Sequence, residues 1–156
     1  MAILLFIAVI IVDQITKAVI AANQTYVVLI DKLLSLTFTK NSGAAFSFLN
    51  DKDWAQTFFI IITFIALLCF TFLYYKTRKN GKLLKYSLIL IMSGAIGNLI
   101  DRIRFNYVVD FISIHFFPAI FNVADMALTI GATLFVIHYL FFDKDAVFKK
   151  KTKNDL

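Results

Sequence analysis

The chain has 156 residues, of which 60% are hydrophobic and only 17% are charged. Soluble domains are usually about half apolar and a quarter charged, so this composition excludes a water-soluble globule and also a disordered chain. The net charge is +6, and every acidic residue is an aspartate. With one cysteine, Cys69, and two histidines, His115 and His138, a disulfide framework and a zinc site are not expected. The sequence indicates a membrane protein.

Four apolar stretches lie at about 1–22, 54–75, 83–100 and 121–142. About 20 apolar residues are enough to cross the hydrocarbon core of a bilayer, so each stretch predicts a transmembrane helix. The first stretch ends in Ala21-Ala22, which loosely suggests a cleaved signal peptide. It lacks a basic leading segment, however, and Asp13 and Lys17 interrupt it, so we expect a retained helix.

The basic residues indicate the orientation. They gather between the second and third stretches and in the tail 143–156, which places both segments and both termini in the cytoplasm. Loops 23–53 and 101–120 are then external. Because topology and anionic lipid explain the basic tail, no nucleic-acid partner is expected.

The external loops carry their own patterns. Segments 25–29 and 33–39 are rich in β-branched and aromatic residues, with Asp31-Lys32 between them as a turn, and predict a small β-structure on the membrane surface. The second loop mixes aromatic and polar residues, for which we expect a short interfacial helix. The predicted fold is an all-α integral membrane protein, 1–156, with these two external elements.

The unusual polar residues gather near the external face. Asp101 ends the third stretch, Asp125 begins the fourth, and Asp110 lies in the loop between them. An ionisable residue within a membrane span is costly and therefore suggests function. Asn98 and Asn122 each precede an aspartate by three residues, a spacing that puts amide and carboxylate on one helix face.

Two neighbouring carboxylates share a proton, so one can act as a base on water while the other acts as an acid. The spacing alone does not select two of Asp101, Asp110 and Asp125. Structural alternatives also exist: Asp101 can pair with Arg102 at a helix end, and Asp125 can be a favourable charge at a helix start.

Asp13 and Lys17 have the spacing of an i,i+4 ion pair, for which a structural role is as reasonable as a direct one. Ser93, Gly94 and Gly97 resemble small-residue helix packing. Two other functions compete with acid–base catalysis: a small ion- or proton-coupled carrier, and a lipid-binding scaffold without catalysis.

Five motifs in order resemble those of the lipoprotein signal peptidases, the signal peptidase II family. They are Asp13-Gln-Ile-Thr-Lys17, Asn41-Ser-Gly-Ala-Ala-Phe46, Gly94-Ala-Ile-Gly-Asn98-Leu-Ile-Asp101-Arg102, Val108-Val-Asp110-Phe111 and Phe121-Asn122-Val-Ala-Asp125. The resemblance covers nearly the whole chain. It implies that the first external loop is a β-cradle and that the second contains a periplasmic helix.

The resemblance further implies an aspartic endopeptidase of the bacterial inner membrane, with its active site at the external face. Its substrates are prolipoproteins whose cysteine carries a diacylglyceryl group, and cleavage falls just before that cysteine. Neither a metal nor another cofactor is expected. We also expect contact with membrane lipids and a monomeric protein.

By the same resemblance, Asp110 and Asp125 are the catalytic pair and Lys17 is a structural partner. Supporting and substrate-contacting positions are Asp13, Asn41, Gly43, Asn98, Asp101, Arg102 and Asn122.

Overall fold

Four long helices form the body of the molecule in the computed structural model, which describes residues 1–43, 54–79 and 81–142. They are α1 (Ala2–Asn23), α2 (Ala55–Thr77), α3 (Lys82–Phe105) and α4 (Val123–Ile137), the last continued by the π-helix η2 (His138–Phe142). Each is long and apolar enough to cross a membrane, which confirms the four predicted spans. The predicted cytoplasmic tail lies outside the described residues.

The third helix is longer than predicted. It continues to Phe105 rather than ending near residue 100, so Asp101 and Arg102 belong to its last turns and not to a loop. The helix ends at Asn106, whose left-handed conformation (φ 60°) turns the chain into the next strand. This turn carries Asp110 back beside the helix.

The external segments form one antiparallel sheet of four strands in the order β1-β2-β3-β4. The strands are β1 (Tyr26–Ile30), β2 (Leu34–Asn41), β3 (Val108–Ile114) and β4 (Ile120–Phe121). The predicted hairpin of β1 and β2 is confirmed, and Lys32 in its turn has a positive φ of 54°.

The predicted interfacial helix is wrong. Residues 106–122 contain β3 and β4 and no helix. Val108 and Val109 begin a largely apolar strand that pairs with β2. This pairing supplies partners for backbone groups that an isolated segment would have to satisfy alone. The fold is therefore four helices with an open sheet, not an all-α fold.

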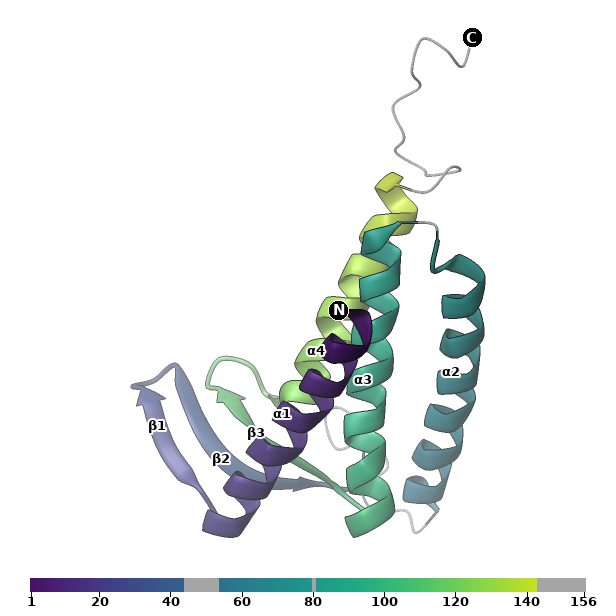
Figure 1. Cartoon of the computed structure of the whole chain (residues 1–156). Coiled ribbons are helices and arrows are strands. Elements are labelled where there is room, and N and C mark those ends of the chain that lie inside the picture. The colour runs from purple at the N-terminus through teal and green to yellow at the C-terminus, as the bar shows by residue number, and fades with distance from the viewer. Residues whose placement is uncertain (44–53, 80, 143–156) are drawn as a thin grey trace, which may run out of the picture.

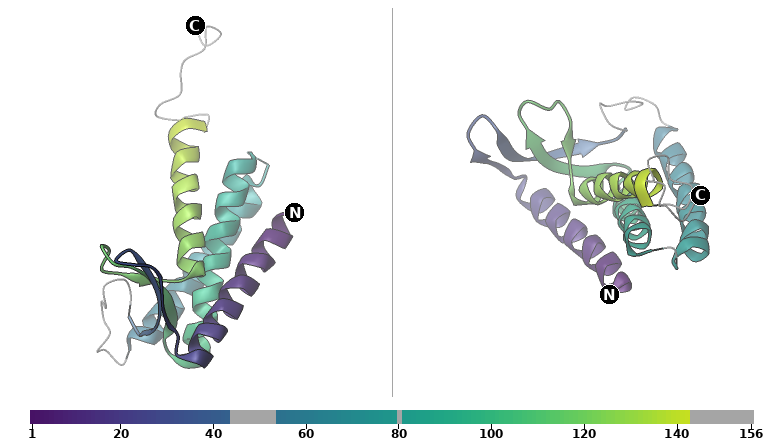
Figure 2. Two further views of the ribbon diagram at one scale, coloured as in Figure 1. Left: turned by 90° about the vertical axis from the view of Figure 1, so that its left-hand side faces the viewer. Right: turned by 90° about the horizontal axis from the view of Figure 1, so that it is seen from above.

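Helix α3 is the centre of the bundle. It contacts α1, α2 and α4, and 61% of its most apolar window is buried, against no more than 22% for any other span. Figures 1 and 2 show the sheet beside the end of the bundle where α1 and α3 end and α2 and α4 begin. The outer helices expose large apolar side chains, as lipid-facing helices do.

Small residues bring α3 and α4 close together. A methyl group added at Gly131 would lie 2.8 Å from the backbone N of Ile91 and from the carbonyl O of Ser87. At Gly94 it would collide with the carbonyl O of Ala124, and at Gly97 it would lie 3.0 Å from Ala124 Cβ. The predicted small-residue packing is therefore present, and it brings the start of α4 against the polar end of α3.

Candidate active site

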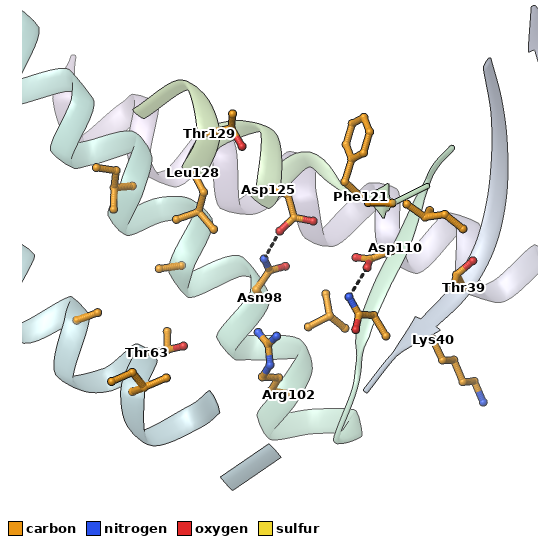
Figure 3. Close-up of a pocket in the computed structure, with 18 of the residues that line it drawn as sticks. Thr39, Lys40, Thr63, Asn98, Arg102, Asp110, Phe121, Asp125, Leu128 and Thr129 are labelled. Atoms are coloured by element: carbon orange, nitrogen blue, oxygen red, sulfur yellow. Dashed lines mark hydrogen bonds between the residues drawn. The ribbon is translucent and has the colours of Figure 1, made fainter. Parts of the chain in front are cut away.

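Two carboxylates face one cavity at the polar end of the bundle. Asp110 comes from β3 and Asp125 from the first turn of α4, and both line a cavity of about 690 Å³ between α2, α3, α4 and the sheet (Figure 3). Asp101 is not among the lining residues. Of the three aspartates that the spacing left open, the structure thus brings Asp110 and Asp125 together.

Asn122 links the two carboxylates. Its side-chain nitrogen donates to Asp110 Oδ1 at 2.6 Å, and its side-chain oxygen accepts from the backbone N–H of Asp125 at 2.9 Å. Its own backbone N–H donates to Asp125 Oδ2 at 3.1 Å, which completes a capping box at the start of α4. Asn122 and Asp110 are buried, whereas Asp125 is half-buried, so the contact between Asn122 and Asp110 is held away from solvent.

Each carboxylate has a second amide donor. Asn41 Nδ2 donates to Asp110 Oδ2 and Asn98 Nδ2 donates to Asp125 Oδ1, both at 2.7 Å (Figure 3). Asn98 therefore orients an aspartate on the neighbouring helix and not Asp101, its neighbour on its own helix. All four carboxylate oxygens of the pair thus accept a hydrogen bond from an N–H group.

The environment of Asp110 favours its protonated form. Burial, and to a smaller extent the nearby charge of Asp125, raise the pKa of its carboxyl from the usual value to about 6. The hydrogen bonds from Asn41 and Asn122 and the charge of Lys17 oppose this rise. Asp110 is therefore suited to hold a proton at mildly acidic pH.

Behind the cavity, Lys17 is the centre of a buried ionic network. Its ammonium group lies 2.9 Å from Asp13 Oδ2 and 3.1 Å from Asp101 Oδ2, and it donates to Asn98 Oδ1 at 2.9 Å. The i,i+4 pair of Asp13 and Lys17 is therefore present. The expected alternative for Asp101, an ion pair with Arg102, is not found, because Asp101 pairs with Lys17.

The two acids of this network hold the backbone just before each cavity carboxylate. Asp101 Oδ2 accepts the N–H of Val109 at 3.1 Å, one residue before Asp110. Asp13 Oδ1 accepts the N–H of Ala124 at 2.8 Å, one residue before Asp125. The positive charge of Lys17 thus compensates the negative charges of both Asp13 and Asp101.

Gln14 belongs to the same network, and the sequence reasoning missed it. Its side-chain nitrogen donates to Asp101 Oδ1 at 3.0 Å, and to Asp13 Oδ2 and the carbonyl oxygen of Gly97 at 3.2 Å. The only available signal was its position beside Asp13 in the first-helix motif.

Arg102 faces the cavity from α3. One of its terminal nitrogens lies 3.4 Å from the carbonyl oxygen of Gly43, and its guanidinium lies 5.2 Å from the ring centre of Phe59. Gly43 is itself held by Asn41, which accepts its N–H at 3.0 Å. Within the described ranges, Arg102 makes no ion pair. Residues 44–46 of the Asn41–Phe46 motif lie outside those ranges.

The site does not contain an evident metal centre. Among the described residues, no group of three or more His, Cys, Asp or Glu side chains could hold a metal ion. The chemistry available at the cavity is that of two amide-oriented carboxylates, which can exchange protons with a water molecule and with a carbonyl group.

This fold and site define a membrane protein of four spans with a paired-carboxylate cavity at one end of its bundle. The family model of signal peptidase (SPase) II matches residues 5–141. The chain therefore belongs to the signal peptidase II family, a family of membrane peptidases, as the five motifs predicted.

Individual relatives agree with this assignment. The chain is 42% identical to the lipoprotein signal peptidase of Clostridium tetani, covering 88% of this chain and 90% of that protein. It is 40% identical to that of Acinetobacter baylyi, covering 94% and 85%.

Two solved structures, both described as bacterial membrane enzymes, share the fold. The first has a TM-score of 0.84 at 36% identity and covers 97% of this chain and 93% of its own. The second has a TM-score of 0.80 at 38% identity and covers 93% and 94%.

Proposed function

We propose that the chain is an aspartic endopeptidase that removes signal peptides from prolipoproteins, cleaving just before a cysteine that carries a diacylglyceryl group. The observation that carries this proposal is the pairing of Asp110 and Asp125 through Asn122 at one cavity. Family membership supplies the substrate class.

In the proposed mechanism, Asp125 is the base and Asp110 is the acid. Asp125 takes a proton from a water molecule, whose oxygen attacks the scissile carbonyl carbon, while Asp110 gives its proton to the carbonyl oxygen. The tetrahedral intermediate then collapses: the C–N bond breaks, the leaving amine accepts the proton held by Asp125, and one hydroxyl of the intermediate returns its proton to Asp110 as the new carboxyl group forms. The raised pKa of Asp110 supports its role as acid.

The amides and Lys17 orient the pair without reacting. Asn41, Asn98 and Asn122 fix the directions of the carboxylates, and holding reacting groups in one geometry contributes to the rate. Lys17 is a structural partner: it holds Asp13 and Asp101, which in turn fix the backbone just before Asp125 and Asp110. Arg102 and Gly43 are placed to contact the substrate chain.

The site lies at the external face in this proposal, with both termini in the cytoplasm of a bacterial inner-membrane protein. The basic α2–α3 connection supports this orientation, since it lies at the end of the bundle opposite the carboxylates (Figure 1). A signal-peptide helix crossing the same membrane would present its outer end at the cavity. The chain acts as one membrane-embedded domain, a monomer in contact with lipids.

No observation favours the carrier alternative. A proton or ion pathway needs polar groups spread across the membrane, whereas Asp13, Asp101, Asp110 and Asp125 gather in one connected cluster at one end.

The direct test is proteolysis by the purified protein in detergent. We expect a prolipoprotein carrying the diacylglyceryl group to be cut just before its cysteine, and the unmodified precursor to remain uncut, as mass spectrometry would show. A chelator should leave the rate unchanged. Equal cleavage of both precursors, or cleavage at another bond, would overturn the substrate assignment.

A further inference from the structure

The cavity at Asp125 has two branches. Besides the large cavity, a smaller one of about 370 Å³ lies between residues 117–121 and α4. Five residues line both cavities: Phe117, Ala119 and Phe121 from the loop and β4, and Asp125 and Thr129 from α4. Leu128 lines only the large one, which we term the main branch, whereas Met126 and Ile130 line only the small one, which we term the side arm.

Helix geometry explains the division. Successive residues of an α-helix are about 100° apart around its axis, so Asp125 and Thr129 lie on one ridge of α4. Leu128 then lies on one flank of this ridge, and Met126 and Ile130 lie on the other. Figure 3 shows Thr129 one turn along α4 from Asp125 and Leu128 on the side of α2 and α3. The carboxylate-bearing residue Asp125 therefore faces both branches.

We propose that the side arm seats one acyl chain of the diacylglyceryl group on the substrate cysteine. This inference rests on the proposed function. Such a substrate is branched at the residue beside the scissile bond: the signal peptide leads one way, and the lipid leaves through the cysteine side chain. A cavity that divides at the proposed catalytic base matches this branching.

The chemistry of the branches assigns their occupants. Thr63, Asn98 and Arg102 in the main branch offer hydrogen-bonding groups that suit a peptide. The residues that belong to the side arm alone, Met126 and Ile130, are apolar. They are 43% and 50% exposed on a membrane-spanning helix, so the arm opens toward lipid.

The side arm contributes more to the position of the substrate than to its binding affinity. Lipid tails are as apolar as the side chains that line it, so moving an acyl chain from the bilayer into the arm releases little hydrophobic free energy. A seated chain instead fixes the cysteine, and with it the scissile bond, relative to Asp125. The flexible Met126 side chain can adapt to such a chain.

The first test fills the arm. We would measure kcat/KM of the enzyme variants Met126→Trp and Ile130→Trp. The substrates would be two lipopeptides, one whose cysteine carries diacetylglyceryl and one whose cysteine carries dipalmitoylglyceryl. The expected result is a loss of roughly tenfold or more for the palmitoyl substrate and less than about a twofold change for the acetyl substrate. Val136→Trp is the matched control, because Val136 is exposed on α4 and lines neither branch, and it should change neither value.

Equal losses for both substrates, or no loss for the palmitoyl substrate, would overturn the side-arm assignment while leaving the proposed function intact. Failure of the unsubstituted protein to cleave any lipopeptide would instead remove the proposed function.

A second measurement does not depend on activity. A lipopeptide with a photoreactive group at the end of one acyl chain would be bound to the Asp110→Asn variant and irradiated. Crosslinks to Met126 or Ile130 are expected. Crosslinks confined to Ile62 and Ala66 of the main branch would contradict the assignment.

Discussion

At the scale of single residues, the site consists of donors matched to carboxylate oxygens. Asp110 accepts from Asn41 and Asn122, and these two hydrogen bonds favour its ionised form. Burial and the charge of Asp125 outweigh them, so that the pKa of Asp110 rises to about 6. The pKa of Asp110 therefore depends on opposing effects, and removing the hydrogen bond of one amide should change it.

Asn41→Ala tests this balance. The proposed acid is lost as pH rises through about 6, so the rate of cleavage should fall on the alkaline side of the pH profile. Removing the Asn41 donor destabilises the ionised carboxylate, so this alkaline fall should move to higher pH in the variant. A pH profile of kcat/KM measures the shift.

Asn23→Ala is the control, because Asn23 is exposed and bonds only within its own helix. An alkaline fall that stays in place or moves to lower pH in Asn41→Ala would contradict the assignment of the proton to Asp110.

Lys17→Met tests the network behind the site. The variant would leave Asp13 and Asp101 buried without their cation, which costs about 3–5 kcal/mol when one partner of a buried pair is removed. Thermal unfolding in detergent should show a clear fall in stability. Adding Asp13→Asn and Asp101→Asn should recover part of it, since no unpaired charge then remains.

Lys32→Met, in the exposed turn between β1 and β2, should leave unfolding unchanged. If Lys17→Met melts like the unsubstituted protein, the ionic network does not stabilise this fold.

At the scale of elements, apolar length and β-rich composition were sufficient to predict the four helices and the β1–β2 hairpin. The helix expected before α4 was wrong because the partner of β3 is β2, about 70 residues earlier in the chain: Asp110 pairs with Thr39, and Val108 with Asn41. Such long-range pairing leaves little trace in local composition.

Long-range contacts also limited what the sequence could predict about the site. The sequence supplied Asp101, Asp110 and Asp125 as candidates, and only the family motif selected two of them. The strand register is what carries Asp110 to Asn41, and no local spacing encodes it. Asp101 and Asp13 accept hydrogen bonds from the backbone N–H groups of Val109 and Ala124. Every residue except proline has such a group, so composition could not indicate these contacts.

Gly131→Ala tests the packing of α3 against α4. The added methyl group would meet backbone atoms of Ser87 and Ile91, which cannot rotate away, so the helices would have to separate. Overpacking of this kind costs about 1–3 kcal/mol, and thermal unfolding in detergent should report it. Ala132→Val also adds volume, but on an exposed position of α4. A variant Gly131→Ala as stable as Ala132→Val would contradict the close packing.

At the scale of the whole molecule, polar and apolar groups are separated along the bundle. Exposed apolar side chains lie along α1 and α2, while the buried acids, amides and Lys17 form one connected cluster that includes residues of the sheet. In the proposed orientation, the four helices hold this polar cavity at the level where the outer end of a signal-peptide helix would arrive. This placement makes a peptidase for lipid-anchored substrates physically reasonable without a thiol at the site.

The central claim is that Asp110 and Asp125 together cleave the prolipoprotein. We expect Asp110→Asn and Asp125→Asn each to lower the rate of signal-peptide release by at least roughly a thousandfold. Asp31→Asn makes the same chemical change in the exposed β1–β2 turn and should keep the full rate. Thermal unfolding of all three variants in detergent would show whether they remain folded.

The most direct measurement is therefore the rate at which each variant processes a diacylglyceryl-modified prolipoprotein in detergent. The account predicts that both folded site variants fail to release the signal peptide while Asp31→Asn releases it normally. Release at the normal rate by either Asp110→Asn or Asp125→Asn would contradict the account.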